Sequence, residues 1–216
     1  MRKITAVLMC VSLLILTSGC ATMDAKSKGA IAGAGIGALL GGVISKDDPA
    51  KGAMIGAALG AIAGAEIGRY LDKKNKTAKE TATAYSYKPE KGTVVNVETV
   101  AMEPALVKPG GTSKLVINYA LLTSDSEKVI SVTETREIMS GGKTLKAIGP
   151  AVKQRDSGTY ITEQEVTFPS NLPEGLYTLK GSVEAQGKTS IKETEFKVSK
   201  IETDSGCLYA INRVVP

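Results

Sequence analysis

The sequence predicts a protein of two parts, a helical hairpin suited to a membrane and then an antiparallel β-sandwich. Residues 29–71 carry glycine at every fourth position within each half, with mainly aliphatic residues between the glycines. Residues 93–200 alternate apolar and polar side chains and are divided by turns that contain Gly or Pro. A spacing of four forms one stripe along a helix, whereas a spacing of two forms one face of a strand. The expected fold class is therefore α plus β in separate domains.

The chain begins with the pattern of an export signal. Arg2 and Lys3 precede an apolar run over residues 4–16, and small residues then precede Cys20. A positive start, a short apolar run and a small-residue cleavage site are typical of a signal peptide that is later removed. We therefore assign residues 1–19 to a signal peptide.

The end of this signal, Leu16-Thr17-Ser18-Gly19-Cys20, resembles the bacterial lipobox. The resemblance implies that Cys20 is lipidated and becomes the mature N-terminus, with residues 20–28 as a lipidated start and polar spacer. The alternative is an ordinary secretory signal that happens to contain a cysteine. Because Ala21 follows the cysteine, the resemblance to proteobacterial lipoproteins also implies delivery to the outer membrane.

The glycine stripe over residues 29–71 predicts two packed helices. In lipid the backbone must form its hydrogen bonds internally, so a helix forms despite the glycines, and small residues let two helices approach closely. A flexible linker or a soluble helical pair are the alternatives. The residues expected to pack the helices are Gly29, Gly33, Gly37 and Gly41, then Gly52, Gly56, Gly60, Gly64 and Gly68.

The second helix is short for a membrane span. Residues 52–65 would extend about 21 Å as a helix, whereas a hydrocarbon core of about 30 Å requires about 20 residues. A full span therefore requires Glu66 and Arg69 to lie near the interface, with Tyr70 at the headgroups.

The lipobox cysteine, the two glycine-rich runs and the following Ile-Gly-Arg-Tyr-Leu-Asp-Lys-Lys resemble the glycine-zipper two-helix outer-membrane lipoproteins of the surface-antigen type. The resemblance covers roughly residues 20–75. Members of that family are mostly described as structural or stress-linked envelope proteins. The resemblance therefore implies a location and a mode of helix packing rather than a chemical activity.

Residues 72–92 are rich in Lys, Thr and Ala and are expected to form a polar linker. Seven strands are expected in the β-sandwich over residues 93–200. The final residues, 201–216, are expected to form a tail or an extra strand. The predicted strands are Thr93–Val100, Ser113–Leu122, Lys128–Ile138, Lys143–Ile148, Thr159–Phe168, Gly175–Ala185 and Thr189–Ser199.

Two segments of the β region, 107–112 and 172–177, resemble turns of immunoglobulin-like and fibronectin-like domains of bacterial surface proteins. The resemblance implies an Ig-like sandwich. The chain has no Trp, and after removal of the signal its one thiol besides Cys20 is Cys207, so the hallmark Trp and disulfide of antibody domains are missing.

Composition argues against catalysis and against a metal or other cofactor. The chain has no His and no cysteine pair of metal-binding spacing. Carboxylates such as Glu134, Glu137, Glu163 and Glu165 are interpreted as a solvated sheet face. The net charge of +5 is not combined with aromatic-basic interleaving, so nucleic acid is not an expected partner.

These observations favour a non-enzymatic envelope protein with a structural or interaction role. The expected partners are membrane lipid, through Cys20 and the hairpin, an envelope protein or glycan, and a second copy through the glycine stripes. The alternative is an oligomeric pore or membrane-perturbing protein. The first helix lacks the polar stripe that a pore requires, which favours the structural role, with the C-terminal domain in the periplasm.

Overall fold

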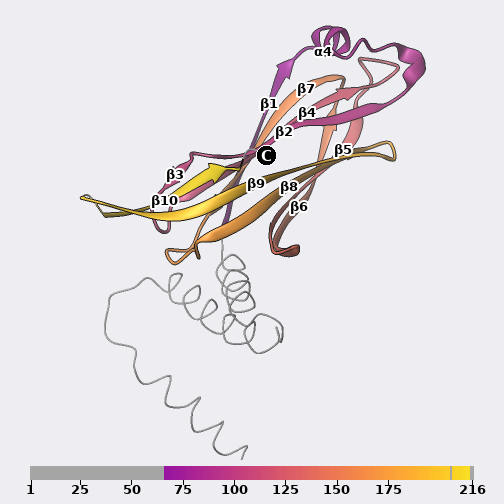
Figure 1. Ribbon diagram of the computed structural model, residues 1–216. Coiled ribbons are helices and arrows are strands. Elements are labelled where there is room, and N and C mark those ends of the chain that lie inside the picture. The colour runs from indigo at the N-terminus through magenta and orange to yellow at the C-terminus, as the bar shows by residue number, and fades with distance from the viewer. Residues whose placement is uncertain (1–65, 205, 215–216) are drawn as a thin grey trace, which may run out of the picture.

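The computed structural model describes residues 66–204 and 206–214, and this part of the chain consists mostly of antiparallel strands (Figure 1). The elements are β1 (Glu66–Lys76), α4 (Ala78–Ala84), η1 (Pro89–Lys91), β2 (Val94–Glu103), β3 (Leu106–Val107), β4 (Thr112–Leu122), β5 (Ile130–Ser140), β6 (Lys143–Arg155), β7 (Gly158–Thr167), β8 (Gly175–Ala185), β9 (Lys188–Thr203) and β10 (Gly206–Arg213).

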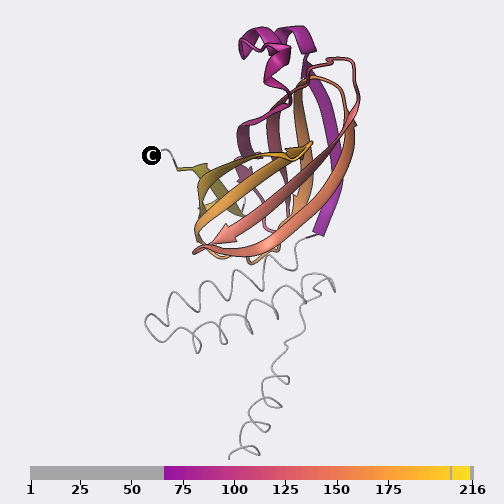
Figure 2. The same cartoon turned by 90° about the vertical axis from the view of Figure 1, so that its right-hand side faces the viewer.

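The strands form two sheets that pack face to face. One sheet has the order β1-β7-β4-β2 and the other has the order β3-β10-β9-β8-β5-β6. The second view shows how the two sheets curve around a shared interior (Figure 2). Their close approach requires Gly181 on β8, because an added Cβ would lie 2.7 Å from a methyl carbon of Val100 on the opposite sheet.

The core follows from the alternation of side chains along the strands. In β8 the residues from Tyr177 to Ala185 are buried at every second position. β5 shows the same period, with buried residues at every second position from Ile130 to Ser140. The two inner faces interdigitate into one apolar cluster that includes Leu115, Ile117, Tyr119, Leu121, Val132, Ile138, Val166, Leu179, Val183 and Phe196.

All seven predicted strands of the β region are present, and Gly175–Ala185 has the predicted bounds. The largest difference is β6, which was expected over Lys143–Ile148 and continues to Arg155. Gly149 adopts a φ of +106°, and the pairing of β5 with β6 shifts register between Glu134 and Arg136, opposite this site. The strand therefore passes the Gly-Pro sequence by a bulge rather than ending there.

The tail forms the extra strand that the sequence suggested. β10 pairs antiparallel with β9 along its whole length and with the short β3 at Tyr209 and Ala210. The predicted turn at residues 108–111 connects β3 to β4, where Gly110 has a φ of +73°.

The structure corrects the boundary between the two predicted parts. Residues 66–71, assigned to the second helix of the hairpin, lie in strand β1. Gly68, assigned to helix packing, lies in the same strand, where an added Cβ would be 2.9 Å from the Cβ of Glu165. These residues form a strand because the backbone N–H and C=O groups along one edge of β7 would otherwise be unpaired, and pairing with β1 satisfies them.

Residues 72–92 are likewise more ordered in structure than a polar linker. β1 continues to Lys76, and α4 begins after a capping box in which Thr77 and Glu80 each bond the other's backbone N–H. The helices in the described part of the chain lack the length and apolar character of a membrane span. Cys20, the hairpin residues 29–65 and the signal peptide lie outside the described residues.

Candidate functional site

The candidate site is the attachment of β1, because this strand connects the predicted membrane part to the β domain. Of the residues predicted to carry lipid or pack helices, only Gly68 lies within the described part of the chain, on β1. The contacts that hold β1 therefore decide how the two parts of the protein are joined.

Within the part of the chain that the structure describes, β1 is the outer strand of its sheet and pairs only with β7. The antiparallel register runs from Glu66 opposite Thr167 to Lys76 opposite Thr159, with a shift between Ile67 and Tyr70. At this shift the side-chain amide of Gln164 donates a hydrogen bond of 2.9 Å to the carbonyl of Gly68. The side chain thus bonds a backbone group at the irregularity in the ladder.

On the inner side of β1, Tyr70 reaches into a buried polar cluster centred on Glu134. Glu134 is fully buried on β5. Its Oε1 accepts hydrogen bonds from the hydroxyls of Tyr70 and Tyr119, each at 3.0 Å. Its Oε2 accepts from the hydroxyl of Thr162 at 2.8 Å and from Nη2 of Arg136 at 3.3 Å. An ionised carboxylate has about four acceptor positions, so the oxygens of Glu134 are saturated.

Arg136 balances this carboxylate. Arg136 is 1 % exposed. Its guanidinium donates from Nε to the carbonyl of Leu115 at 3.2 Å and from Nη2 to the hydroxyl of Thr162 at 2.6 Å. Its Cζ lies 5.7 Å from the centre of the Tyr70 ring, within range of a cation–π contact. Burial lowers the pKa of Arg136, and the neighbouring charge of Glu134 opposes that effect.

A second set of contacts lies between β1 and β6, the edge strand of the other sheet. Arg155 on β6 forms an ion pair with Asp72 and also reaches the hydroxyl of Tyr70 at 3.5 Å. The ammonium of Lys153 lies 4.1 Å from the centre of the Tyr70 ring. The edge strand β1 of one sheet is therefore tied to the edge strand β6 of the other by charged side chains around Tyr70.

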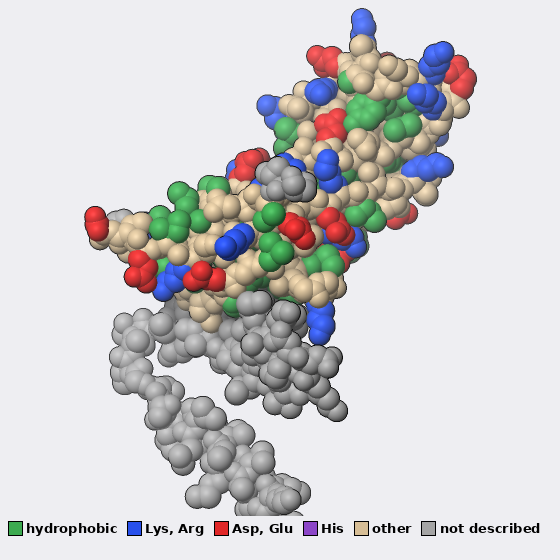
Figure 3. Space-filling view, viewed as in Figure 1, with side chains coloured by type: hydrophobic (Ala, Val, Ile, Leu, Met, Phe, Trp, Pro, Cys, Tyr) green, Lys and Arg blue, Asp and Glu red, His purple; other side chains and the backbone are tan. Residues whose placement is uncertain are grey.

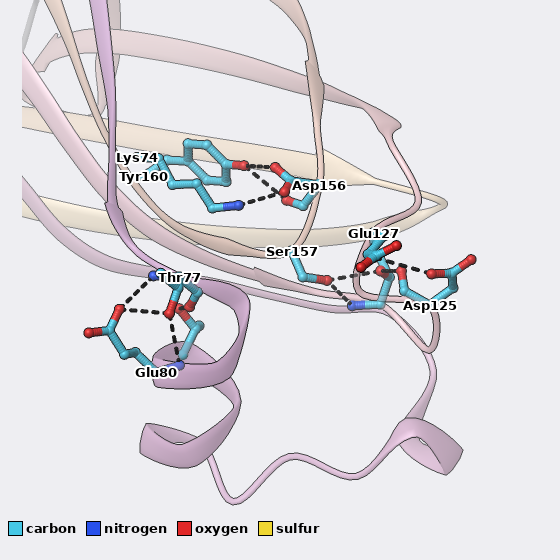
Figure 4. A network of polar contacts seen from close by, with 10 residues as sticks. Lys74, Thr77, Glu80, Asp125, Glu127, Asp156, Ser157 and Tyr160 are labelled. Carbon is cyan, nitrogen blue, oxygen red and sulfur yellow. Dashed lines mark hydrogen bonds and ion pairs between the residues drawn. The ribbon is translucent and has the colours of Figure 1, made fainter.

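Towards the far end of β1, Lys74 pairs with Asp156 at 2.6 Å, and the hydroxyl of Tyr160 donates to the same carboxylate at 2.5 Å (Figure 4). The same view shows the cap formed by Thr77 and Glu80 at the start of α4. The pair of Lys74 and Asp156 fixes the end of β1 to the loop between β6 and β7. A hydrogen bond of 3.0 Å between the hydroxyls of Thr81 and Thr159 joins α4 to β7.

The cluster is suited to holding a strand rather than to catalysis. Every acceptor position of Glu134 is occupied, so the carboxylate has no free position for a substrate proton. Burial, and then the charge of Glu134, raises the pKa of Tyr70 well above its ordinary value. The phenol therefore remains a neutral hydrogen-bond donor at physiological pH.

This cluster differs from what the sequence predicts. The expected solvated face is wrong for Glu134, which is buried, whereas Glu137, Glu163 and Glu165 do lie at partly exposed positions. The signal was present in the spacing: Val132 and Ile138 lie on the same side of β5 as Glu134 and Arg136, so an apolar face carried two opposite charges. A pair of opposite charges two residues apart on a buried face predicts an internal ion pair.

Comparison with known proteins adds one family. The YMGG-like Gly-zipper family matches residues 1–72, a third of this chain of 216 residues. This match supports a membrane or envelope association for the N-terminal part. No curated protein matched the chain.

Solved structures resemble parts of the chain only distantly. A β-glucuronidase of Parabacteroides merdae is 16 % identical, with a TM-score of 0.31. The match covers 56 % of this chain and 16 % of that enzyme. A conjugative transposon lipoprotein from Bacteroides eggerthii is 14 % identical over 50 % of this chain and 97 % of its own, with a TM-score of 0.26. A PapD-like domain of human CEP192 is 11 % identical, and the match covers 55 % of this chain and 91 % of that domain, with a TM-score of 0.32. Likenesses of this size assign no function.

Proposed function

We propose that this protein is a non-enzymatic lipoprotein of the bacterial envelope, with a structural or interaction role. Lipid on Cys20 and a glycine-zipper hairpin hold it in the membrane, and an immunoglobulin-like β-sandwich carries the interaction. The match of residues 1–72 to a Gly-zipper family supports the membrane part. Two packed antiparallel sheets around one core support the sandwich.

The observation that carries the proposal is the direct connection between the two parts. β1 begins at Glu66, two residues after Gly64, and pairs with β7 from that residue onward. A domain meant to search for distant partners on a tether would be joined by a polar, flexible segment. Here the strand that leaves the glycine zipper is itself part of the sheet, so the β domain is held close to the membrane.

The remaining features of the proposal follow from the sequence. Ala21 after the lipidated cysteine favours the outer membrane, and the return of the hairpin to the face that carries the lipid leaves the β domain in the periplasm. The partners are membrane lipid, a second copy through the glycine stripes, and an envelope protein or glycan, without nucleic acid. No cofactor is required, and the saturated Glu134 supports a role without catalysis.

Lipidation and location are tested by growing cells with an alkyne analogue of palmitate. We expect the label on the wild-type chain in the outer-membrane fraction and no label on a Cys20→Ala variant. A wild-type chain without label in the soluble fraction would overturn the proposal.

The topology of the hairpin requires a separate experiment. An Asp47→Cys, Cys207→Ser variant is treated in intact cells with a membrane-impermeant maleimide. Labelling in intact cells supports a hairpin that crosses the outer membrane. Labelling only after lysis would replace this topology with a shallow hairpin, and channel activity of the purified chain in planar bilayers would replace the structural role with a pore.

A further inference from the structure

We propose that the end of the β domain at which β1 begins lies directly against the phospholipid headgroups, with Ile67, Leu176, Lys108 and Lys143 as its contact residues. This surface is called the membrane-facing end below. The inference rests on the proposed function, because it takes the glycine zipper to be in the membrane.

Several segments that are distant in sequence meet at the membrane-facing end. Glu66 lies opposite Thr167 at the end of β7, and Thr167 also lies opposite Thr112 at the start of β4. The loop after β7 is fixed there by the hydrogen bond from the Phe168 N–H to the Gly111 carbonyl. Both views show the start of β1, the β7–β8 loop and the β5–β6 turn at one end of the domain (Figures 1 and 2).

The second sheet is held at the same end. The hydroxyl of Ser140, at the end of β5, donates a hydrogen bond of 3.0 Å to the carbonyl of Leu176, at the start of β8. Lys143 follows directly after the β5–β6 turn. The membrane-facing end is therefore a composite of both sheets and does not depend on one loop.

The length of the chain requires this end to be close to the membrane. Glu66 is the second residue after Gly64, the last zipper glycine before β1. Even fully extended, two residues reach only about 7 Å. The headgroup layer on each side of the hydrocarbon is itself about 5–8 Å thick. A domain that begins within this distance cannot be separated from the headgroups by a layer of bulk water.

The side chains exposed at this end match a lipid interface. Ile67 is 46 % exposed and Leu176 is 49 % exposed, although both are large and apolar. Lys108 and Lys143 are exposed, and within residues 66–204 and 206–214 neither has an ion-pair partner. Apolar side chains combined with free cations suit the boundary between headgroups and acyl chains of an anionic membrane.

The face of the β domain drawn in Figure 3 carries no patch of a single charge sign. On the face drawn in Figure 3, positive and negative side chains are interspersed over the β domain rather than separated by sign. Exposed acidic Glu174 lies near the membrane-facing end and will reduce the attraction, so the contact combines apolar and cationic side chains rather than resting on charge alone.

The test compares two exposed apolar positions on neighbouring strands. Leu176 begins β8 at the membrane-facing end, and Ile191, 54 % exposed, lies on β9 near the β8–β9 turn. Each is replaced by Cys in a Cys207→Ser background, labelled with an environment-sensitive dye and reconstituted as the full lipidated chain. The vesicles contain phosphatidylcholine and phosphatidylglycerol with brominated acyl chains, which quench a dye close to the membrane.

We expect severalfold stronger quenching for the dye at position 176 than for the dye at position 191. A double substitution, Lys108→Glu with Lys143→Glu, is expected to reduce the quenching at 176 and leave that at 191 unchanged. Equal, weak quenching at both positions, from protein that floats with the vesicles, would overturn this inference and leave the proposed function intact. Protein that fails to float with the vesicles would overturn both.

Discussion

The interior of the β domain has two regions that are held together by different physical interactions. Between β8, β9 and the opposite sheet, the contacts are apolar and include the stacked rings of Tyr177 and Phe196, 5.7 Å apart. Around Glu134 the same space between the sheets is filled by a carboxylate, a guanidinium and three hydroxyls. In the apolar region a substitution lowers stability in proportion to the buried surface that is lost. In the polar region the loss of one partner leaves another buried polar group without a hydrogen bond, so stability depends on every partner being present.

The difference shows why β1 belongs to the domain. An edge strand with exposed Ile67 and Leu71 buries little apolar surface of its own. Tyr70 instead supplies one of four hydrogen bonds to a buried charge, and that bond is formed only when β1 is in place. β1 is thus held in the domain by directional bonds rather than by hydrophobic burial.

The largest expected effect comes from removing the centre of the polar region. Glu134→Ala leaves Arg136 buried without its partner, and such a change costs about 3–5 kcal/mol of unfolding free energy. The measurement is urea unfolding of the detergent-solubilised full chain, followed by the β-sheet circular dichroism signal. The control is Glu137→Ala on the other face of β5, where a partly exposed pair with Lys180 is worth about 0–1 kcal/mol. Similar losses in both variants would contradict a special role for the cluster.

Removing the contribution of β1 itself is expected to have the next effect. Tyr70→Phe takes away one hydrogen bond to a charged acceptor, for a loss of about 1.5–3 kcal/mol. Tyr87→Phe is the matched control, because that hydroxyl bonds only a backbone carbonyl, of Gly92. A loss for Tyr70→Phe no greater than that for Tyr87→Phe would show that β1 is held by its backbone ladder alone.

The same tyrosine gives the cluster an expected dependence on pH. Because the pKa of Tyr70 is raised in the folded protein, the unfolded chain loses that proton first, and stability falls with rising pH above about 10, the ordinary tyrosine pKa. Below that pH the contribution is fully present. Urea midpoints at pH 8 and pH 11 should differ more for the wild-type chain than for Tyr70→Phe. Equal differences would assign the alkaline loss to other groups.

The apolar region is tested by crowding it. Gly181→Ala places a methyl group 2.7 Å from a methyl carbon of Val100 and 3.0 Å from one of Ile117. Overpacking of this kind costs about 1–3 kcal/mol, because the sheets must separate or the side chains must leave their rotamers. Gly187→Ala is the control for backbone strain. Gly187 lies at a turn with a φ of +72°, and an added Cβ would have no atom within 4 Å, so a loss there reflects strain rather than crowding. A larger loss at Gly187 than at Gly181 would contradict close packing as the reason for Gly181.

The smallest expected effect is at the helix that follows β1. Thr77→Ala removes the side-chain cap of α4 and is expected to cost about 1 kcal/mol. Thr83→Ala, whose hydroxyl bonds the carbonyl of Lys79 within the same helix, is the control and should cost less. Comparable losses would show that α4 is held by its packing on β7 and not by its cap.

Much of the β domain was predictable because its information is local. The alternation from Leu176 to Ala185 and the turn residues around it determine a strand whichever partner it has. The capping box at Thr77 and Glu80 is also local information, although it lies inside a polar stretch that resembles a linker. The buried cluster was harder to predict, because Glu134 and Arg136 read as surface residues until Thr162, Tyr119 and Tyr70 are brought to them from three other strands.

The sequence by itself determined the strands of the β domain, their turns and the position of the glycine stripe, because each depends on the spacing of neighbouring residues. Only the tertiary structure decided where the stripe ends and the sheet begins. Gly68 continues the glycine spacing of four, so residues 66–71 were expected to extend the helix although Glu66 and Arg69 depart from the apolar run. They form a strand because β7 offers an unpaired edge and Glu134 a buried acceptor for Tyr70, and both arise only when distant segments have folded together.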